Sequence, residues 1–174
     1  MNNFSISTDG LATALQKSAA ALKTAGNDMD EAIALVTAGN AIVQDPDSVG
    51  SGVRTIALRI QGTELAKQEL AELGEDVDDY VVQTASKLNA KVKELTKSAG
   101  NAFKGVSLLD ENGNYRSTYE ILQDIADVYN EIVDADKKNG TNRMQGLLEL
   151  LAGKSCLEYM ETYIQRIYLI ARAA

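Results

Sequence analysis

Three loops place acidic and amide side chains at the spacing of calcium ligands. Asp110, Asn112 and Asn114 fill positions one, three and five of an EF-hand-type loop. Such a loop also needs glycine at position six and glutamate at position twelve, but Tyr115 and Ile121 stand there. Residues 45–50 and 134–140 fail similarly, because valine, isoleucine, lysine or glutamine replaces the ligands. We therefore predict turns and helix starts at all three loops, and no metal site.

A second motif resembles a phosphate-binding loop. In the segment LAGKS, residues 151–155, Lys154 and Ser155 follow Gly153 as they do at the end of a Walker A motif. That motif also requires a glycine five residues before Gly153, where Leu148 stands, and a strand that leads into the loop. The residues before Gly153 have helical periodicity instead. We predict that Gly153 ends one helix and that Ser155 begins the next.

Paired carboxylates are the third arrangement that could carry out a reaction. Asp78 and Asp79 form such a pair, but neither lies in an apolar segment of the kind that tunes a catalytic carboxyl group. The chain has no histidine, the commonest general base and transition-metal ligand, and its lone Cys156 has no histidine partner. We predict no catalytic residue, no cofactor and no metal, and therefore that the protein is not an enzyme.

The composition indicates one helical domain. Of 174 residues, 45% are hydrophobic, 24% are charged and one is proline, as in a globular protein that can bury its own core. Acidic residues outnumber basic ones by 25 to 17, and the net charge of -8 argues against a specific nucleic-acid partner. No apolar run is long enough for a membrane span, and no signal-peptide pattern follows Met1. The one basic cluster is interpreted as a solvated helix face, with a weak anionic contact as the alternative: Lys87, Lys91, Lys93 and Lys97.

Apolar residues recur every three or four positions through most of the chain, which predicts amphipathic helices. Polar caps indicate where the helices start: Ser7 or Thr8, Asp28 with Glu31, Asp45 with Pro46, Ser117 with Glu120, Thr141, and Ser155 with Glu158. Gly50 and Gly52 suggest a close approach between helices. We predict an all-α fold, a compact bundle of about six or seven amphipathic helices, with room for one short β-hairpin near residues 106–116.

The last predicted helix has more apolar residues than one buried face absorbs. Met160, Ile164 and Ile167 continue the stripe that should face the core. The surplus residues predict an interaction surface: Tyr159, Tyr163, Tyr168, Leu169 and Ile170.

Four segments, in this order, resemble the core region of phage tail tape measure proteins. They are GLATALQKSAAALKTAGNDMDEAIALVTAGNAIVQDPDSVGSGVRTIALRIQG (residues 10–62), TASKLNAKVKELT (84–96), NYRSTYEILQDIADVYNEI (114–132) and LLELLAGK (147–154). After Lys154 the chain departs from the family's pattern. The resemblance thus implies a tape-measure-like helical core domain over residues 1–154, on which a C-terminal helix, residues 155–174, packs.

The resemblance also implies a structural role in tail assembly and tail length determination, in a phage or prophage. The implied partners are tail tube, tail chaperone or tail-tip proteins, with self-association as a further option. The implied location is the virion tail, and the host bacterial cytoplasm during assembly. A fully helical chain of this length would span only about 260 Å, at about 1.5 Å per residue, so a docking or end-organising module of a longer protein is expected. Two alternatives stay open: a peptidoglycan-degrading module of a tail protein, and a bacterial helical adaptor unrelated to phages.

Overall fold

The computed structural model describes residues 6–98, 102–154 and 157–173, and within the last helix it describes the side chains of residues 160–169. These residues form eight helices and no β-strand: α1 (Thr8–Thr24), α2 (Met29–Val43), α3 (Pro46–Gln61), α4 (Glu64–Glu72), α5 (Ala85–Thr96), α6 (Thr118–Asn139), α7 (Arg143–Ala152) and α8 (Leu157–Ala173). The all-α prediction is confirmed.

The predicted number of helices was slightly too low. Gly62, with φ of 65°, ends α3, and the Thr63 hydroxyl accepts a hydrogen bond from Ala66 N–H to begin α4. Apolar residues continue on both sides of this break, so periodicity alone does not reveal it.

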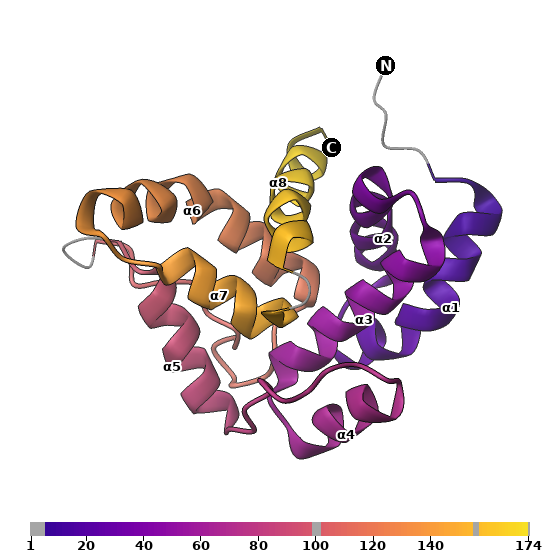
Figure 1. Cartoon of the computed structure of the whole chain (residues 1–174), viewed down its shortest axis with the longest axis horizontal. Helices are drawn as coiled ribbons and strands as arrows, with labels where there is room; N and C mark the ends of the chain where they lie inside the picture. The colour runs from indigo at the N-terminus through magenta and orange to yellow at the C-terminus, as the bar shows by residue number, and fades with distance from the viewer. Residues whose placement is uncertain (1–5, 99–101, 155–156, 174) are drawn as a thin grey trace.

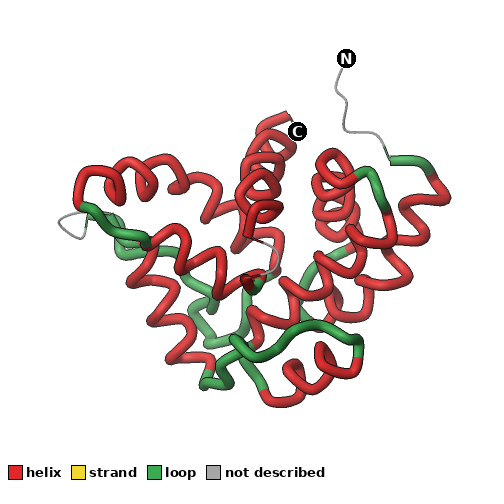
Figure 2. The backbone as a smooth tube through the Cα atoms, in the orientation of Figure 1, coloured by secondary structure: helices red, strands yellow, loops and turns green. Residues whose placement is uncertain are grey.

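Helix α3 runs through the middle of the fold and contacts α1, α2, α4, α6 and α7. Figure 1 shows α1 and α2 on one side of α3, α5 to α7 on the other, α4 below, and α8 between the two sides. The longer loops of the described chain join α4 to α5 and α5 to α6 (Figure 2). A single apolar cluster draws residues from every helix, so the described helices share one core.

Helices α1 and α3 pack closely because residue 50 has no side chain. A Cβ atom on Gly50 would lie 2.6 Å from the carbonyl oxygen of Ala14 and 3.0 Å from the Lys17 Cβ. Lys17 also pairs with Asp47 at 2.6 Å on the rim of this contact. The expectation that Gly50 marks a close helix approach is confirmed.

Several predicted helix starts are confirmed by side-chain caps. Asp28 and Glu31 form both bonds of a capping box, and Ser7 accepts a hydrogen bond from Gly10 N–H. Ser117 accepts from Glu120 N–H at 3.2 Å, but the Glu120 carboxylate lies 3.8 Å from Arg116 instead of completing a box. Helix α7 begins one residue later than expected, with Asn142 and not Thr141 at the N-cap position.

The predicted hairpin near residues 106–116 is present in a minimal form. Leu109 and Tyr115 make one antiparallel bridge, and Asp110 N–H donates to Asn114 O at 2.8 Å. The Asp110 carboxylate accepts the N–H groups of Asn112 and Asn114, both at 2.9 Å, while Gly113 adopts φ of 81°. The acidic and amide residues of this loop therefore build a turn, as the sequence predicts.

Two glycine substitutions should have opposite effects on stability. Gly50→Ala places a methyl group against the α1 backbone and should lower the free energy of unfolding by about 1–3 kcal/mol. Gly146→Ala in α7 meets nothing within 4 Å and should raise it by about 0.5–1 kcal/mol, because alanine favours helix. Urea denaturation of both variants measures this difference. Equal effects of the two substitutions would contradict the close packing of α1 and α3.

Candidate interaction surface

Helix α8 contributes mainly to the core. Met160, Ile164 and Ile167 are buried, as the periodicity predicts. Tyr163 is buried too, and its hydroxyl donates to Leu35 O in α2 at 2.8 Å. Its assignment to an interaction surface was wrong, because the tyrosine ring fills the space between α8 and α2. The surplus of apolar residues is thus explained in part by the packing of α8 against three helices, α2, α6 and α7.

The remaining surface candidates on α8 differ from one another. Leu169 is 48% exposed, whereas Tyr168 is half-buried and packs against the core. The side chains of Tyr159 and Ile170 lie outside the described residues. Tyr168 and Leu169 line a groove of about 250 Å³ between α6 and α8, together with Ala126, Asp127, Tyr129, Asn130, Ile164 and Gln165. Two of the five predicted residues thus meet at one groove.

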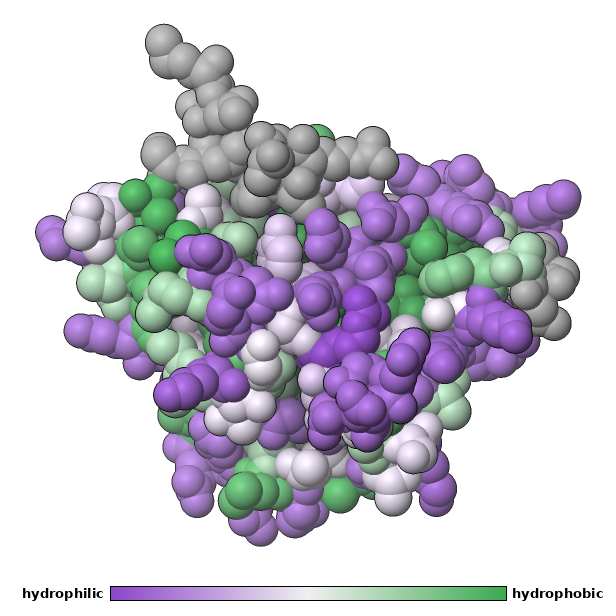
Figure 3. Space-filling model, turned by 180° about the vertical axis from the view of Figure 1, so that it is seen from behind, coloured by the Kyte–Doolittle hydropathy of each residue, from purple (hydrophilic) through white to green (hydrophobic). Residues whose placement is uncertain are grey.

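The sequence prediction missed a larger group of exposed apolar side chains around α4. Leu65 is 75% exposed and Val81 is 61% exposed, and Leu73 and Val82 are also exposed. Hydrophobic surface is visible at the lower end of the molecule, where α4 lies (Figure 3). The signal was present, because Leu65 lies off the stripe of Ala66 and Leu70 that α4 buries.

Arg59 of α3 is the most enclosed charge among the described residues with an ion pair. Its side chain is 5% exposed, and Nη2 donates to Asp79 Oδ1 at 2.8 Å and to Asp76 O at 3.1 Å. The guanidinium carbon lies 5.6 Å from the centre of the Tyr80 ring. The other carboxylate oxygen of Asp79 accepts the N–H of Lys154 at 3.1 Å. Arg59 and Asp79 therefore join α3, the loop after α4 and the end of α7.

The positive charge of Arg59 helps to lower the pKa of Asp79. Burial alone would raise the pKa of this carboxyl group, but the hydrogen bond and the positive charge of Arg59, with the Lys154 N–H, hold the pKa below its ordinary value. A cavity of about 270 Å³ lies beside this pair, lined by Arg59, Asp76, Asp78, Asp79 and Lys154. The lowered pKa keeps Asp79 ionised at neutral pH, as its ion pair with Arg59 requires.

Asp136 has a structural role in the calcium-like segment of residues 134–140, which precedes α7. Its carboxylate accepts Met144 N–H at 2.9 Å and the Thr141 hydroxyl at 2.6 Å, and Arg143 Nε lies 3.5 Å away. Burial would raise the pKa of Asp136, but these partners hold the pKa below its ordinary value. Because Asp136 belongs to α6, the last turn of one helix caps the first turn of the next.

The segment that resembles a phosphate-binding loop has a structural role as well. Gly153 follows α7 with φ of 81°, so the LAGKS segment ends a helix, as predicted. Ser155 and Cys156 lie outside the described residues. In the described part of the chain, no group of three or more histidine, cysteine or acidic side chains has the arrangement of a metal site. No helix there combines the length and apolarity that a membrane span requires.

Comparison of this chain with protein family models, curated proteins and solved structures gave no match.

Removal of the Asp79 carboxylate should destabilise the fold strongly. Asp79→Ala leaves the enclosed Arg59 without its ion pair and should lower the free energy of unfolding by about 2–4 kcal/mol at pH 7. The matched control, Asp78→Ala, changes an exposed neighbour and should stay within about 0.5 kcal/mol. Urea denaturation of both variants provides the comparison.

The pH dependence of the same pair has a definite sign. Since the folded-state pKa of Asp79 is lowered, its contribution is complete above the unfolded-state pKa of about 3.9 and is lost as the pH falls through the folded-state value. The difference between the wild-type chain and Asp79→Ala should therefore shrink in acid. A difference that is constant from neutral to acidic pH would rule out this role.

Substitutions on α8 should separate its core residue from its surface residue. Tyr163→Ala removes a fully buried ring and should cost about 3–5 kcal/mol, whereas Tyr163→Phe removes the hydroxyl that donates to Leu35 and should cost about 1 kcal/mol. Leu169→Ser should change the thermal midpoint little, because Leu169 is half-exposed. Thermal denaturation gives the order, and equal midpoints for Tyr163→Ala and Leu169→Ser would refute the packing of α8.

Proposed function

We propose that this chain is a structural module of a phage tail tape measure protein that acts in tail assembly and tail length determination through protein–protein contacts. The proposal starts from the four ordered segments between residues 10 and 154 that resemble the core region of that family. Tail tube, tail chaperone and tail-tip proteins are its proposed partners, in the virion tail and, during assembly, in the host bacterial cytoplasm. Its proposed role is structural and not enzymatic.

The observation that carries the proposal is where those segments meet. Arg59 lies in the first segment, and Gly153 and Lys154 close the last. A Cβ atom on Gly153 would lie 2.6 Å from Arg59 Nη2, and Asp79 binds both Arg59 and the Lys154 N–H. Two distant parts of the resemblance thus meet at a single contact. Residues that specify a fold are expected at contacts between segments that are distant in sequence. This contact therefore supports the view that the resemblance extends over the whole module.

The structural uses of the acidic residues also favour an architectural role. Asp79 and Asp136, whose pKa values are lowered, each hold the ends of two helices together. Glu31 caps α2 and also accepts the Ser117 hydroxyl at 2.8 Å, which ties α2 to the start of α6. These carboxylates stabilise helix junctions, which is what a rigid docking module requires.

Deletion in the native gene tests the proposal. Removal of the codons for residues 10–154, in frame, should abolish full-length tails in induced or infected cells while heads still form, because tube growth depends on the module. Negative-stain electron microscopy of the particles measures this, and the intact gene supplied in trans should restore the tails. Tails of normal length and number in the deletion strain would refute the proposal.

A turbidity assay separates the lytic alternative. The purified chain should leave a peptidoglycan suspension unchanged, with a muramidase as the positive control. A fall in turbidity would favour a wall-degrading module instead.

A further inference from the structure

One side of α4 and its C-terminal end carry both acidic and apolar side chains. We call this surface the acidic face, and its members are Leu65, Glu69, Glu72 and Leu73. All four are exposed. Leu65, Glu69 and Glu72 recur at helical spacing and so share one side of α4, while Ala66 and Leu70 face the core. Lys67 is the one basic residue between Glu64 and Asp79, so this surface is strongly negative.

A surface of opposite charge lies on α5. We call it the basic face, and its members are Lys87, Lys91, Lys93, Lys97, Phe103 and Lys104. Lys87 and Lys91 are exposed, and Phe103 is 40% exposed. Glu94, paired with Lys97 at 2.8 Å, is the one acidic residue between Thr84 and Lys104.

Phe103 belongs to the basic face because its loop is fixed to the end of α5. Phe103 N–H donates to the Ser98 hydroxyl at 2.7 Å, and Val106 N–H donates to the Thr96 hydroxyl at 2.7 Å. Gly105 lies so close to Lys93 that a Cβ atom would meet its carbonyl oxygen at 2.2 Å. These contacts fix the backbone of Phe103 next to the C-terminal end of α5.

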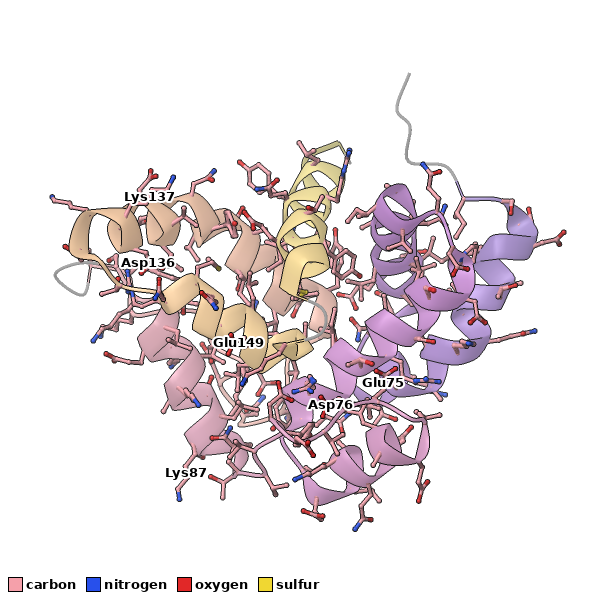
Figure 4. All side chains as sticks on the ribbon, viewed as in Figure 1. Glu75, Asp76, Lys87, Asp136, Lys137 and Glu149 are labelled. Atoms are coloured by element: carbon pink, nitrogen blue, oxygen red, sulfur yellow. The ribbon has the colours of Figure 1, made fainter. Side chains whose placement is uncertain are left out.

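The two faces do not neutralise one another within one copy. In the described part of the chain, no ion pair involves Glu69 or Glu72, and none involves Lys87 or Lys91. Figure 4 shows Lys87 pointing away from the body near the start of α5, while Glu75 and Asp76 lie on the segment that crosses beside α4. The charges of both faces are thus available to a partner.

We propose that the occupant of the acidic face is the basic face of a second copy of this chain. The opposite charges match, and each face carries exposed apolar surface, from Leu65 and Leu73 on one and from Phe103 on the other. Because two different faces meet, the contact is head to tail, and each added copy presents a free face for the next. This inference goes beyond the proposed function and does not depend on a tail.

The electrostatics set the strength of this contact. A net charge of -8 makes two copies repel at long range. Added salt screens charges further apart than about 10 Å at 0.1 M, and at high concentration it also weakens the pairing of exposed charges in contact. Association should therefore be weak, favoured by moderate salt and lost at high salt.

Paired charge reversals test the contact. Glu69→Lys with Glu72→Lys makes the acidic face positive, and Lys87→Glu with Lys91→Glu makes the basic face negative. Each double variant should associate at least about tenfold more weakly than the wild-type chain, because like charges then face each other. An equimolar mixture of the two variants should associate again, since the reversed faces match. Sedimentation velocity over a range of concentrations, in about 0.1 M and about 1 M salt, measures all four samples.

The controls make the outcome decisive. Glu131→Lys with Asp134→Lys alters exposed residues of α6 outside the groove by the same charge as the first variant and should associate like the wild-type chain. Far-ultraviolet circular dichroism should show that every variant keeps its helices. A wild-type sedimentation coefficient that does not change with concentration would overturn the proposal. So would a mixture that fails to associate, or a control that associates as weakly as the reversals. None of these results decides the role in tail assembly, which the deletion experiment tests separately.

Discussion

The enclosed charge of Arg59 is the constraint on which the arrangement of the other helices depends. A guanidinium group removed from water requires a carboxylate and further acceptors, and here these come from Asp79 and the carbonyl of Asp76. Both acceptors lie in the loop after α4, so this loop must fold back over α3. The same Asp79 then holds the Lys154 N–H just beyond α7. One buried cation thereby sets the positions of a loop and of a helix end that are far apart in sequence.

A second polar junction joins the turn between α1 and α2 to the start of α6. Asn27, buried in the turn between α1 and α2, donates from Nδ2 to Leu22 O at 2.9 Å and to the Thr118 hydroxyl at 3.1 Å. Its Oδ1 accepts Tyr119 N–H at 3.0 Å. A single amide therefore ends α1 and also caps the first turn of α6. With Glu31 and Ser117 beside it, this junction leaves little freedom between the helical hairpin of α1 and α2 and the start of α6.

Much of the fold could be predicted from the sequence because the determinants are local. The apolar stripes, the capping box of Asp28 and Glu31 and the turn at Asp110 each depend on residues within a few positions. The uses of Arg59, Asp79 and Asp136 could not be predicted, since their partners come from other elements. Tyr163 shows the same limit: its apolar character was recognised, but only the position of α2 makes it a core residue. For the candidate surface, the sequence predicted Leu169 and missed Leu65, although the position of Leu65 off the stripe of Ala66 and Leu70 indicates exposure.

The turn at residues 110–114 has a practical consequence. Asp110 closes it through its own backbone and side chain, and the space around Gly113 is empty to 4 Å. A turn that depends so little on the rest of the molecule tolerates extra residues at its tip. A fluorophore or an affinity peptide inserted there should therefore label the chain without disturbing its helices.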